Sequence, residues 1–368
     1  MMNREKLKSD RFSVTLISPR LSAARCVMRI FLSHDASAHD IGKALERAGE
    51  LAGNPLSVRL DTSGDCLSIE IRTNGNPIDP AAFSSLTGVD RIEDPEPVYH
   101  LSSSGTPGTR AIEIPFAGVS IGSENFVVMA GPCAVENDED LLETARVAKN
   151  AGARILRGGA FKPRTSPYSF QGVGPEGLEM LARVREEVGI GIITEAMEPA
   201  TVGAVAEIAD IVQIGSRNMH NYPLLKEAGQ AGKPVLVKRG MSATLEEWLG
   251  AAEYVLSGGN PDVILCERGI RTFSRHSRHT LDIGVIPVIH ERTNLPVIID
   301  PSHATGKASR VPAMARAAVA AGADGLLMEI HPEPSRAMSD GFQTLSFDEY
   351  NTLMSELKLI ADAVGRKI

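Results

Sequence analysis

The stretch FVVMAGPC, residues 126–133, sets the pattern that decides the fold: a short apolar run ends in glycine, proline and cysteine. Similar runs recur to the C-terminus, and a segment with helical spacing follows each one. The runs are FVVMAGPC, RILRGGA, IGIITEA, IVQIGS, PVLVKRG, VILCERG, PVIIDPSH and GLLMEIH. Eight β-α units over about 240 residues predict an α/β fold of the (β/α)8 or TIM barrel type.

An open, doubly wound sheet is the alternative to the barrel, although such sheets usually contain fewer strands. The segment GVGPEG, residues 172–177, has the glycine spacing of a dinucleotide-binding loop. That loop requires its glycines directly after a strand, whereas a long polar segment precedes these. We therefore interpret them as loop and helix-start residues. Two later helix starts carry capping boxes: Thr244 with Glu247, and Ser346 with Glu349.

The part of the chain before the barrel has a different organisation. Residues 26–94 alternate strand-like and helix-like runs in the order β-α-β-β-α-β, which is typical of a small ferredoxin-like α+β domain. Residues 95–110 are rich in proline, serine and glycine and predict a linker. Residues 1–25 have mixed charge and predict a disordered tail. Residues 111–368 then form the barrel with a hairpin at its start.

Composition limits the class of protein. The 368 residues carry a net charge of -8, which argues against binding to nucleic acid because that requires a basic face. No apolar run approaches the roughly 18 residues of a membrane span, and the N-terminus lacks the apolar region of a signal peptide. Four cysteines without CxxC spacing predict a cytoplasmic protein without a disulfide framework.

Polar side chains follow the apolar runs at their C-terminal ends, where barrel enzymes build their active sites. Four of these side chains offer one thiolate, one imidazole and two carboxylates: Cys133, His303, Glu329 and Asp340. Taken alone, the cysteine would be a small buried apolar residue, and the histidine could be structural. Together they are ligands typical of one divalent transition metal, namely Mn, Fe, Co or Zn.

A second group of side chains at the same strand ends is cationic. It consists of Arg157, Lys162, Arg164, Arg217, Lys238 and Arg268. A single cation after a strand usually lies in a solvated loop, but six around one barrel mouth repel one another unless anions fill the site. Arg164, Thr165 and Ser166 could bind a second phosphate separately. The sequence therefore predicts two anionic substrates.

These residues lie in segments that resemble one family. AGPCAVE, LRGGAFKPRTSPYSFQG, QIGSRN, VLVKRG, LCERGIRTF, IDPSHATGK and MEIHPEP…SDGFQ closely resemble type I-beta 3-deoxy-D-arabino-heptulosonate 7-phosphate (DAHP) synthases. The resemblance covers the chain from about Ile114 onward, and the N-terminal domain is similar to the family's regulatory domain in layout only. It implies a transferase that condenses phosphoenolpyruvate with D-erythrose 4-phosphate. The products are DAHP and phosphate, in the first step of the shikimate pathway to chorismate and the aromatic amino acids.

The resemblance also implies a role for each site residue. The metal ligands are Cys133, His303, Glu329 and Asp340. The phosphoenolpyruvate phosphate contacts Arg217 and Arg268, and its carboxylate contacts Arg157 and Lys238. The erythrose phosphate contacts Arg164, Thr165 and Ser166. Lys162 lies between the substrates as a proton donor and Asp300 faces the sugar hydroxyls, so that the catalytic residues are Lys162, Cys133 and His303.

Two alternatives to this activity remain open. The sister synthase of 3-deoxy-D-manno-octulosonate 8-phosphate takes arabinose 5-phosphate as the acceptor. It typically has KANRSS where this chain has KPRTS at 162–166, it lacks the N-terminal module, and some members have asparagine in place of Cys133. A catalytically silent barrel would lack a metal ligand or an anion-binding arginine, and none is missing here.

The role of the N-terminal domain is also open between two hypotheses. By resemblance, the domain binds tyrosine or phenylalanine as a feedback inhibitor of the barrel, within a homotetramer. A purely structural or oligomerising role is the alternative. A fused chorismate mutase is not favoured, because that domain is entirely helical and this segment is rich in strands.

Overall fold

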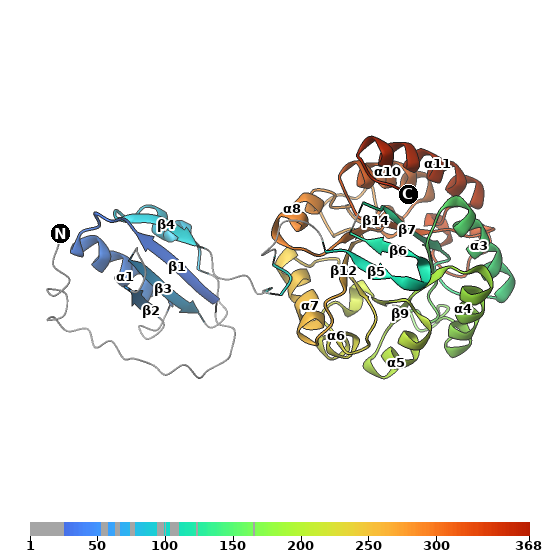
Figure 1. The fold of residues 1–368 in the computed structure, drawn as a ribbon, viewed down its shortest axis with the longest axis horizontal. Coiled ribbons are helices and arrows are strands. Elements are labelled where there is room, and N and C mark those ends of the chain that lie inside the picture. Colours follow the sequence, from blue (N-terminus) through green and yellow to red (C-terminus); the bar gives the residue numbers. More distant parts are fainter. Residues whose placement is uncertain are drawn as a thin grey trace. The chain divides into compact units, whose positions relative to one another are not determined.

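The chain divides into two compact units, Met1–Glu96 and Pro97–Ile368, both drawn in Figure 1. The computed structural model describes residues 26–52, 58–62, 67–73, 78–93, 99, 101–103, 110–122, 124–164 and 166–368. The tail predicted at 1–25 and most of the linker predicted at 95–110 therefore lie outside the described residues.

The first unit has the predicted ferredoxin-like layout. Its elements are β1 (Cys26–Leu32), α1 (Ala38–Ala52), β2 (Val58–Asp61), β3 (Ser68–Thr73), α2 (Ala81–Ser84) and β4 (Val89–Glu93). The sheet order is β2-β3-β1-β4, and each neighbouring pair is antiparallel. Ile69 and Ile71 alternate with Ser68 and Glu70 along β3, and the isoleucines enter the core that also contains Phe83 of α2. This alternation gives one face of the sheet to the apolar core.

The second unit is a closed barrel of parallel strands, as predicted, and the open-sheet alternative is wrong. Its strands are β7 (Val127–Gly131), β8 (Ile155–Arg157), β9 (Gly191–Ala196), β10 (Ile211–Ile214), β11 (Val235–Lys238), β12 (Val263–Glu267), β13 (Val297–Ile299) and β14 (Gly325–Glu329). The last strand pairs with the first, and Glu329 lies opposite Gly131 in that register. The first and last apolar runs therefore end side by side.

Helices surround the strands (Figure 1). They are α3 (Asp138–Ala151), α4 (Pro175–Val188), α5 (Pro199–Ile208), α6 (Tyr222–Gly229), α7 (Leu245–Ser257), α8 (Val285–Arg292), α9 (Pro301–Thr305), α10 (Val311–Ala320) and α11 (Phe347–Ala363). Both predicted capping boxes are confirmed, at the starts of α7 and α11. Gly174 is the N-cap of α4, which confirms that the glycine-rich segment starts a helix. None of the helices in the described part of the chain combines the length and apolarity that a membrane span requires.

A hairpin closes the N-terminal end of the barrel. It consists of β5 (Ile112–Ile114) and β6 (Val119–Ile121), joined by the 3-10 turn η3 (Pro115–Ala117). Ile112, Ile114 and Ile121 are buried in one cluster with the apolar side chains that fill the barrel, such as Val127 and Ile155 near the strand starts. The barrel interior is thus a packed core at this end, so a ligand site belongs at the C-terminal ends of the strands.

Candidate active site

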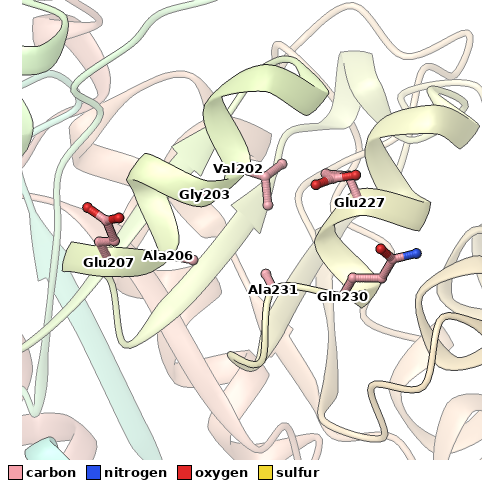
Figure 2. A pocket seen from close by; sticks show the side chains of 7 residues that line it. All are labelled: Val202, Gly203, Ala206, Glu207, Glu227, Gln230 and Ala231. Atoms are coloured by element: carbon pink, nitrogen blue, oxygen red, sulfur yellow. The ribbon is translucent and has the colours of Figure 1, made fainter.

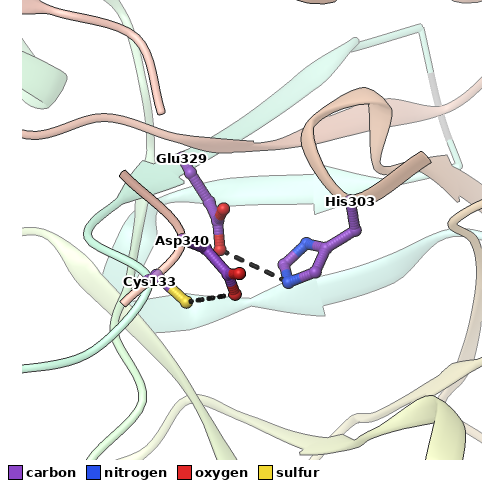
Figure 3. A group of neighbouring side chains, drawn as sticks. All are labelled: Cys133, His303, Glu329 and Asp340. Carbon is purple, nitrogen blue, oxygen red and sulfur yellow. Dashed lines mark hydrogen bonds and ion pairs between the residues drawn. The ribbon is translucent and has the colours of Figure 1, made fainter. Parts of the chain in front are cut away.

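The four predicted metal ligands meet at the C-terminal end of the barrel. Cys133 follows β7, His303 lies in the short helix after β13, Glu329 ends β14, and Asp340 lies in the following loop. One ligand atom from each lies within 4.8 Å of the others. Figure 3 shows the four side chains pointing toward one another. The fold therefore brings together residues that are up to 207 positions apart in the chain.

The loop that carries Asp340 holds this residue in an unusual conformation. Asp340 has φ of 55° and is the one non-glycine residue with positive φ among the described residues. Its Oδ2 lies 3.4 Å from Cys133 Sγ, and Ser339 Oγ lies 3.1 Å from the same sulfur. Left-handed backbone costs free energy for most residues with a side chain, aspartate less than most, and such residues cluster at functional sites. The strain here aims a carboxylate at the thiol.

Asp300 sets the orientation of the His303 ring. Asp300 Oδ1 accepts the backbone N–H of His303 at 3.0 Å, and Oδ2 lies 2.8 Å from His303 Nδ1. The ring Nε2 is left facing Glu329 Oε1 at 3.4 Å. Burial lowers the pKa of His303, although Asp300 opposes this shift. A neutral ring whose Nδ1 lies beside the Asp300 carboxylate can present the lone pair of Nε2 as a ligand.

The side chains of this cluster supply the donor atoms of a divalent transition-metal site. Burial, with a further contribution from Glu329, raises the pKa of the Cys133 thiol to about 11. Burial opposes ionisation of Glu329, but His303 and Arg157 outweigh it and lower the pKa of this carboxyl to about 2. A divalent cation would replace the thiol proton and neutralise the carboxylates. One sulfur, one nitrogen and two carboxylates form a donor set suited to Mn, Fe, Co or Zn.

A cationic pocket adjoins the cluster, since His303 is also part of its wall. Five of the six predicted cations line it: Arg157, Lys162, Arg217, Lys238 and Arg268. Two of these cations form buried ion pairs, one with the cluster carboxylate Glu329 and one with Asp300 beside it. Arg157 Nη1 lies 2.5 Å from Glu329 Oε1, and Lys238 Nζ lies 2.6 Å from Asp300 Oδ2. Both of Asp300's oxygens are thus engaged, and its place beside the sugar hydroxyls stays a prediction.

Arg268 differs from Arg157 and Lys238 because one nitrogen of its guanidinium group lacks an acceptor in the described part of the chain. Its Nη1 is buried and has no hydrogen-bond partner among the described residues. Burial lowers the pKa of Arg268, and neighbouring Arg278 adds to that shift. A buried donor without an acceptor costs stability unless a ligand supplies one. The pocket is therefore built to receive an anion.

In the segment predicted to hold a second phosphate, the described side chains contact the backbone of that same segment. Arg164 does not line the pocket, and its Nε donates to the carbonyl oxygen of Phe170 at 2.8 Å. Ser166 Oγ accepts the backbone N–H of Tyr168 at 3.4 Å, and Thr165 lies outside the described residues. A phosphate site at these three residues stays a prediction.

Several further polar residues belong to the site and had no predicted role, among them Glu195, Arg278 and Gln343. Glu195 lines the pocket with its buried Oε1 unpartnered among the described residues. A Cβ at position 215 would lie 2.1 Å from that oxygen, so the approach requires Gly215. Glu195 does follow an apolar run, which was a usable signal. Arg278 and Gln343 lie in loops away from any strand end; Gln343 ends the SDGFQ segment that resembles one family, but nothing in that segment indicates its contacts.

A second concavity lies on the flank of the barrel between α5 and α6 (Figure 2). Its wall combines small and apolar residues with Glu207, Glu227 and Gln230. None of the predicted site residues lines it. The chemistry-bearing groups are concentrated in the pocket at the strand ends instead.

Comparison with known proteins identifies the family of this chain. Residues 102–364 match the sequence model of the DAHP synthetase I family. A phospho-2-dehydro-3-deoxyheptonate aldolase of Thermotoga maritima is 49% identical over 287 residues, which is 78% of this chain and 84% of the relative. A 2-dehydro-3-deoxyphosphooctonate aldolase of Nitratidesulfovibrio vulgaris is 34% identical over 251 residues, 63% of this chain and 91% of that protein.

Solved structures agree at the level of the whole chain. The crystal structure of the Thermotoga maritima DAHP synthase superposes with a TM-score of 0.76 and 41% identity, covering 93% of this chain and 99% of that one. A truncated form of the Thermotoga maritima enzyme gives a TM-score of 0.69 and 44% identity, covering 73% of this chain and 99% of its own. With a family match over more than half of its length, the chain belongs to the DAHP synthetase I family.

Proposed function

We propose that this chain is a transferase that condenses phosphoenolpyruvate with D-erythrose 4-phosphate to give DAHP and inorganic phosphate. One observation carries the proposal: four metal-ligand side chains converge within 4.8 Å beside a pocket lined by five cations. Such a site can hold a polyanion next to an electrophilic metal. That combination fits a reaction between two phosphorylated substrates.

The pocket cations bind phosphoenolpyruvate in this proposal. Arg217 and Arg268 hold its phosphate, and the unmatched Nη1 of Arg268 supplies a donor that the anion satisfies. Arg157 and Lys238 hold the carboxylate while keeping their contacts with Glu329 and Asp300. Charge-assisted hydrogen bonds from guanidinium groups suit both anions. The substrate is thereby fixed at the barrel mouth beside the ligand cluster.

Cys133, His303, Glu329 and Asp340 would hold one divalent transition metal, of which Mn, Fe, Co and Zn are the candidates. When bound, such a metal supplies Lewis acidity that makes the acceptor aldehyde more electrophilic. Asp300 keeps the His303 ring in the orientation that ligation requires. Arg164, Thr165 and Ser166 bind the phosphate of the acceptor, and Asp300 lies near its hydroxyls.

The reaction itself then needs little from the protein beyond positioning and fixed charge. C3 of phosphoenolpyruvate forms a bond to the aldehyde carbon, and positive charge develops at C2. Buried Lys162 donates a proton to the oxygen of the former aldehyde. Water adds at C2, and breakage of the bond between C2 and the phosphate oxygen releases phosphate and leaves the ketone. Buried carboxylates and cations arranged before the reaction stabilise these charges without reorganisation.

The experiment that tests the proposal measures phosphate release from phosphoenolpyruvate with either erythrose 4-phosphate or arabinose 5-phosphate, before and after chelation. We expect turnover with erythrose 4-phosphate, its loss with a strong chelator and its recovery with Mn²⁺. Turnover with arabinose 5-phosphate alone would instead identify the octulosonate reaction. No turnover with either acceptor in metal-replete protein would indicate a silent barrel.

We also propose that the ferredoxin-like unit binds tyrosine or phenylalanine and inhibits the barrel, within a homotetramer. The support is the sheet order of that unit, together with the resemblance of the chain to a family with such a domain. Initial rates of the full chain with each amino acid test the inhibition. A chain that starts near Ala111 should lose it, and full retention of aromatic sensitivity there would overturn the proposal.

A further inference from the structure

Gln343 contacts the ligand cluster, and both polar atoms of its side-chain amide form hydrogen bonds. This residue ends the 3-10 turn η7 (Gly341–Gln343) and is fully buried. Its Nε2 donates to Glu329 Oε2 at 2.6 Å. Its Oε1 accepts from Arg278 Nη1 at 2.8 Å. Both polar ends of a buried side chain are thus satisfied by charged groups.

Chemistry leaves only one orientation for this amide. Arg278 can only donate hydrogen bonds and ionised Glu329 can only accept them, so the oxygen of Gln343 must face the guanidinium and its nitrogen must face the carboxylate. Arg278 Nη1 also lies 3.5 Å from Asp340 Oδ1. One arginine from the loop after β12 therefore reaches both carboxylates of the cluster, one directly and one through the amide.

The backbone near Arg278 passes close to the helix that carries His303, which places the Arg278 side chain at the site. Gly306, the C-cap of α9, has φ of 65°, and a Cβ there would lie 2.6 Å from Arg278 Cβ. Only glycine allows the loop to pass so close to the helix that carries His303. Arg278 is also part of the pocket wall, with a side chain that is 34% exposed. It thus joins the β12 loop to the β14 loop at the site.

We propose that Arg278 and Gln343 form a clamp that positions Glu329 and Asp340 for metal binding; this inference rests on the metal site of the proposed function. The clamp occupies Oε2 of Glu329. Oε1 is left as the oxygen that faces His303 Nε2 at 3.4 Å. These contacts define the orientation of the Glu329 carboxylate, with Oε1 toward His303.

A neutral amide suits this position better than a second cation. Arg157 already contacts Oε1 of Glu329 at 2.5 Å. A guanidinium directly on Oε2 would add positive charge beside a divalent cation and weaken its binding by Coulomb repulsion. Gln343 instead links Glu329 to Arg278 without placing a charge on Oε2, and the guanidinium of Arg278 faces Asp340 at 3.5 Å.

The test is a Mn²⁺ titration of the metal-stripped full chain, with free Mn²⁺ followed by electron paramagnetic resonance. Partners that orient metal ligands typically contribute about 10- to 100-fold to metal affinity. We expect Gln343→Leu to raise the Kd for Mn²⁺ by about that factor, and Arg278→Met by about 10-fold. Arg275→Met is the matched control, because it removes the same charge from an exposed position in the same loop. It should keep the wild-type Kd.

Two further measurements separate positioning from a general structural effect. The visible spectrum of the Co²⁺ form should change in both clamp variants and not in Arg275→Met, because it reports ligand geometry. The double variant should lose less affinity than the product of the two single losses, because both side chains act through one chain of hydrogen bonds. Arg278→Lys keeps the charge and should recover part of the affinity that Arg278→Met loses.

The clamp and the proposed function can fail separately. Wild-type protein that does not bind Mn²⁺ would refute the metal site itself. Wild-type binding together with unchanged Kd and Co²⁺ spectrum in folded Gln343→Leu would overturn the clamp alone. If Gln343→Leu does not fold, Arg278→Met decides the question, because its partly exposed side chain can be truncated without opening the core.

Discussion

The two ends of the barrel use buried charge in opposite ways. At the hairpin end, Asp210 accepts two hydrogen bonds from Arg185 and one from the backbone of Ile192. Asp324 similarly binds Arg366 at 2.7 Å and the backbone N–H of Val297 at 2.8 Å. These carboxylates join strand starts to helices and to the C-terminal segment.

At the other end, the buried charges are incompletely matched. Arg268 Nη1 and Glu195 Oε1 have no partner among the described residues, and Asp340 is held in a left-handed conformation. A protein that minimised only its free energy would not keep these features together. The buried carboxylates at the hairpin end are fully matched, whereas the ligand-binding end combines matched pairs, such as Arg157 with Glu329, with groups that have no partner among the described residues. Substitutions should therefore separate stability from activity by location.

The largest effect on activity should come from Cys133→Ser at the ligand cluster. The change is nearly isosteric in a buried site and removes the only sulfur ligand of the cluster. We expect kcat to fall by more than 100-fold, since partners one step further from a metal already cost about 10- to 100-fold. Turnover and Mn²⁺ affinity measure the loss. Cys266→Ser is the control, because this other buried cysteine lies outside the cluster, and equal metal loss in both variants would contradict the assignment.

At the opposite end, Asp324→Asn should reduce stability and leave kcat unchanged. Asp324 is 1% exposed, and its loss of charge weakens the contacts with Arg366 and His290. Breaking a buried ion pair costs on the order of 3 kcal/mol. Urea denaturation measures the free energy of unfolding. Asp262→Asn, which breaks the exposed pair with Arg110, should cost less than about 1 kcal/mol. Similar losses in the two variants would remove the distinction.

Arg268→Met should instead weaken substrate binding without reducing stability. Removing a buried charge with an unmatched donor should leave the free energy of unfolding unchanged or raise it by about 1 kcal/mol. The KM for phosphoenolpyruvate should rise about 30-fold, because a charged contact with the substrate is worth about 2 kcal/mol or more. Steady-state kinetics and urea denaturation of the same preparation provide both numbers. Lower stability with an unchanged KM would show that Arg268 is a structural cation.

The barrel and its ligand cluster could be predicted because the relevant information is local. Each buried strand is a short apolar run, and a parallel barrel brings all the residues that follow such runs to one end. Cys133, Glu329 and His303 were identifiable on that basis alone. Asp340 lies further along a loop after the last strand, and it was assigned to the cluster because its carboxylate completes the set of metal-binding side chains.

The pairing of side chains within the site could not be predicted in the same way. The contact between Arg157 and Glu329 joins residues 172 positions apart, and that between Lys238 and Asp300 joins residues 62 apart. Side-chain rotamers and loop paths decide such contacts, and neither has a sequence period. The same reason hides Arg278 and Gln343, whose roles arise only when two loops meet. Residue types at strand ends indicate the chemistry of a site, but its hydrogen-bond network requires coordinates.

The smallest effect should be a change in pH dependence at the ligand-binding end. Burial and the charges of Arg268 and Arg278 lower the pKa of His279 to about 4 from an ordinary value near 6.5. The unfolded chain therefore binds a proton at higher pH than the folded one. Stability from this residue is fully present above about 6.5 and is lost as the pH falls toward about 4. His279→Asn should flatten the decline of unfolding free energy over this window, measured by urea denaturation at several pH values. An unchanged dependence of unfolding free energy on pH would mean that Arg268 and Arg278 do not lower the pKa of His279. The contrast between the two ends of the barrel would then rest on Arg268 and Glu195 alone.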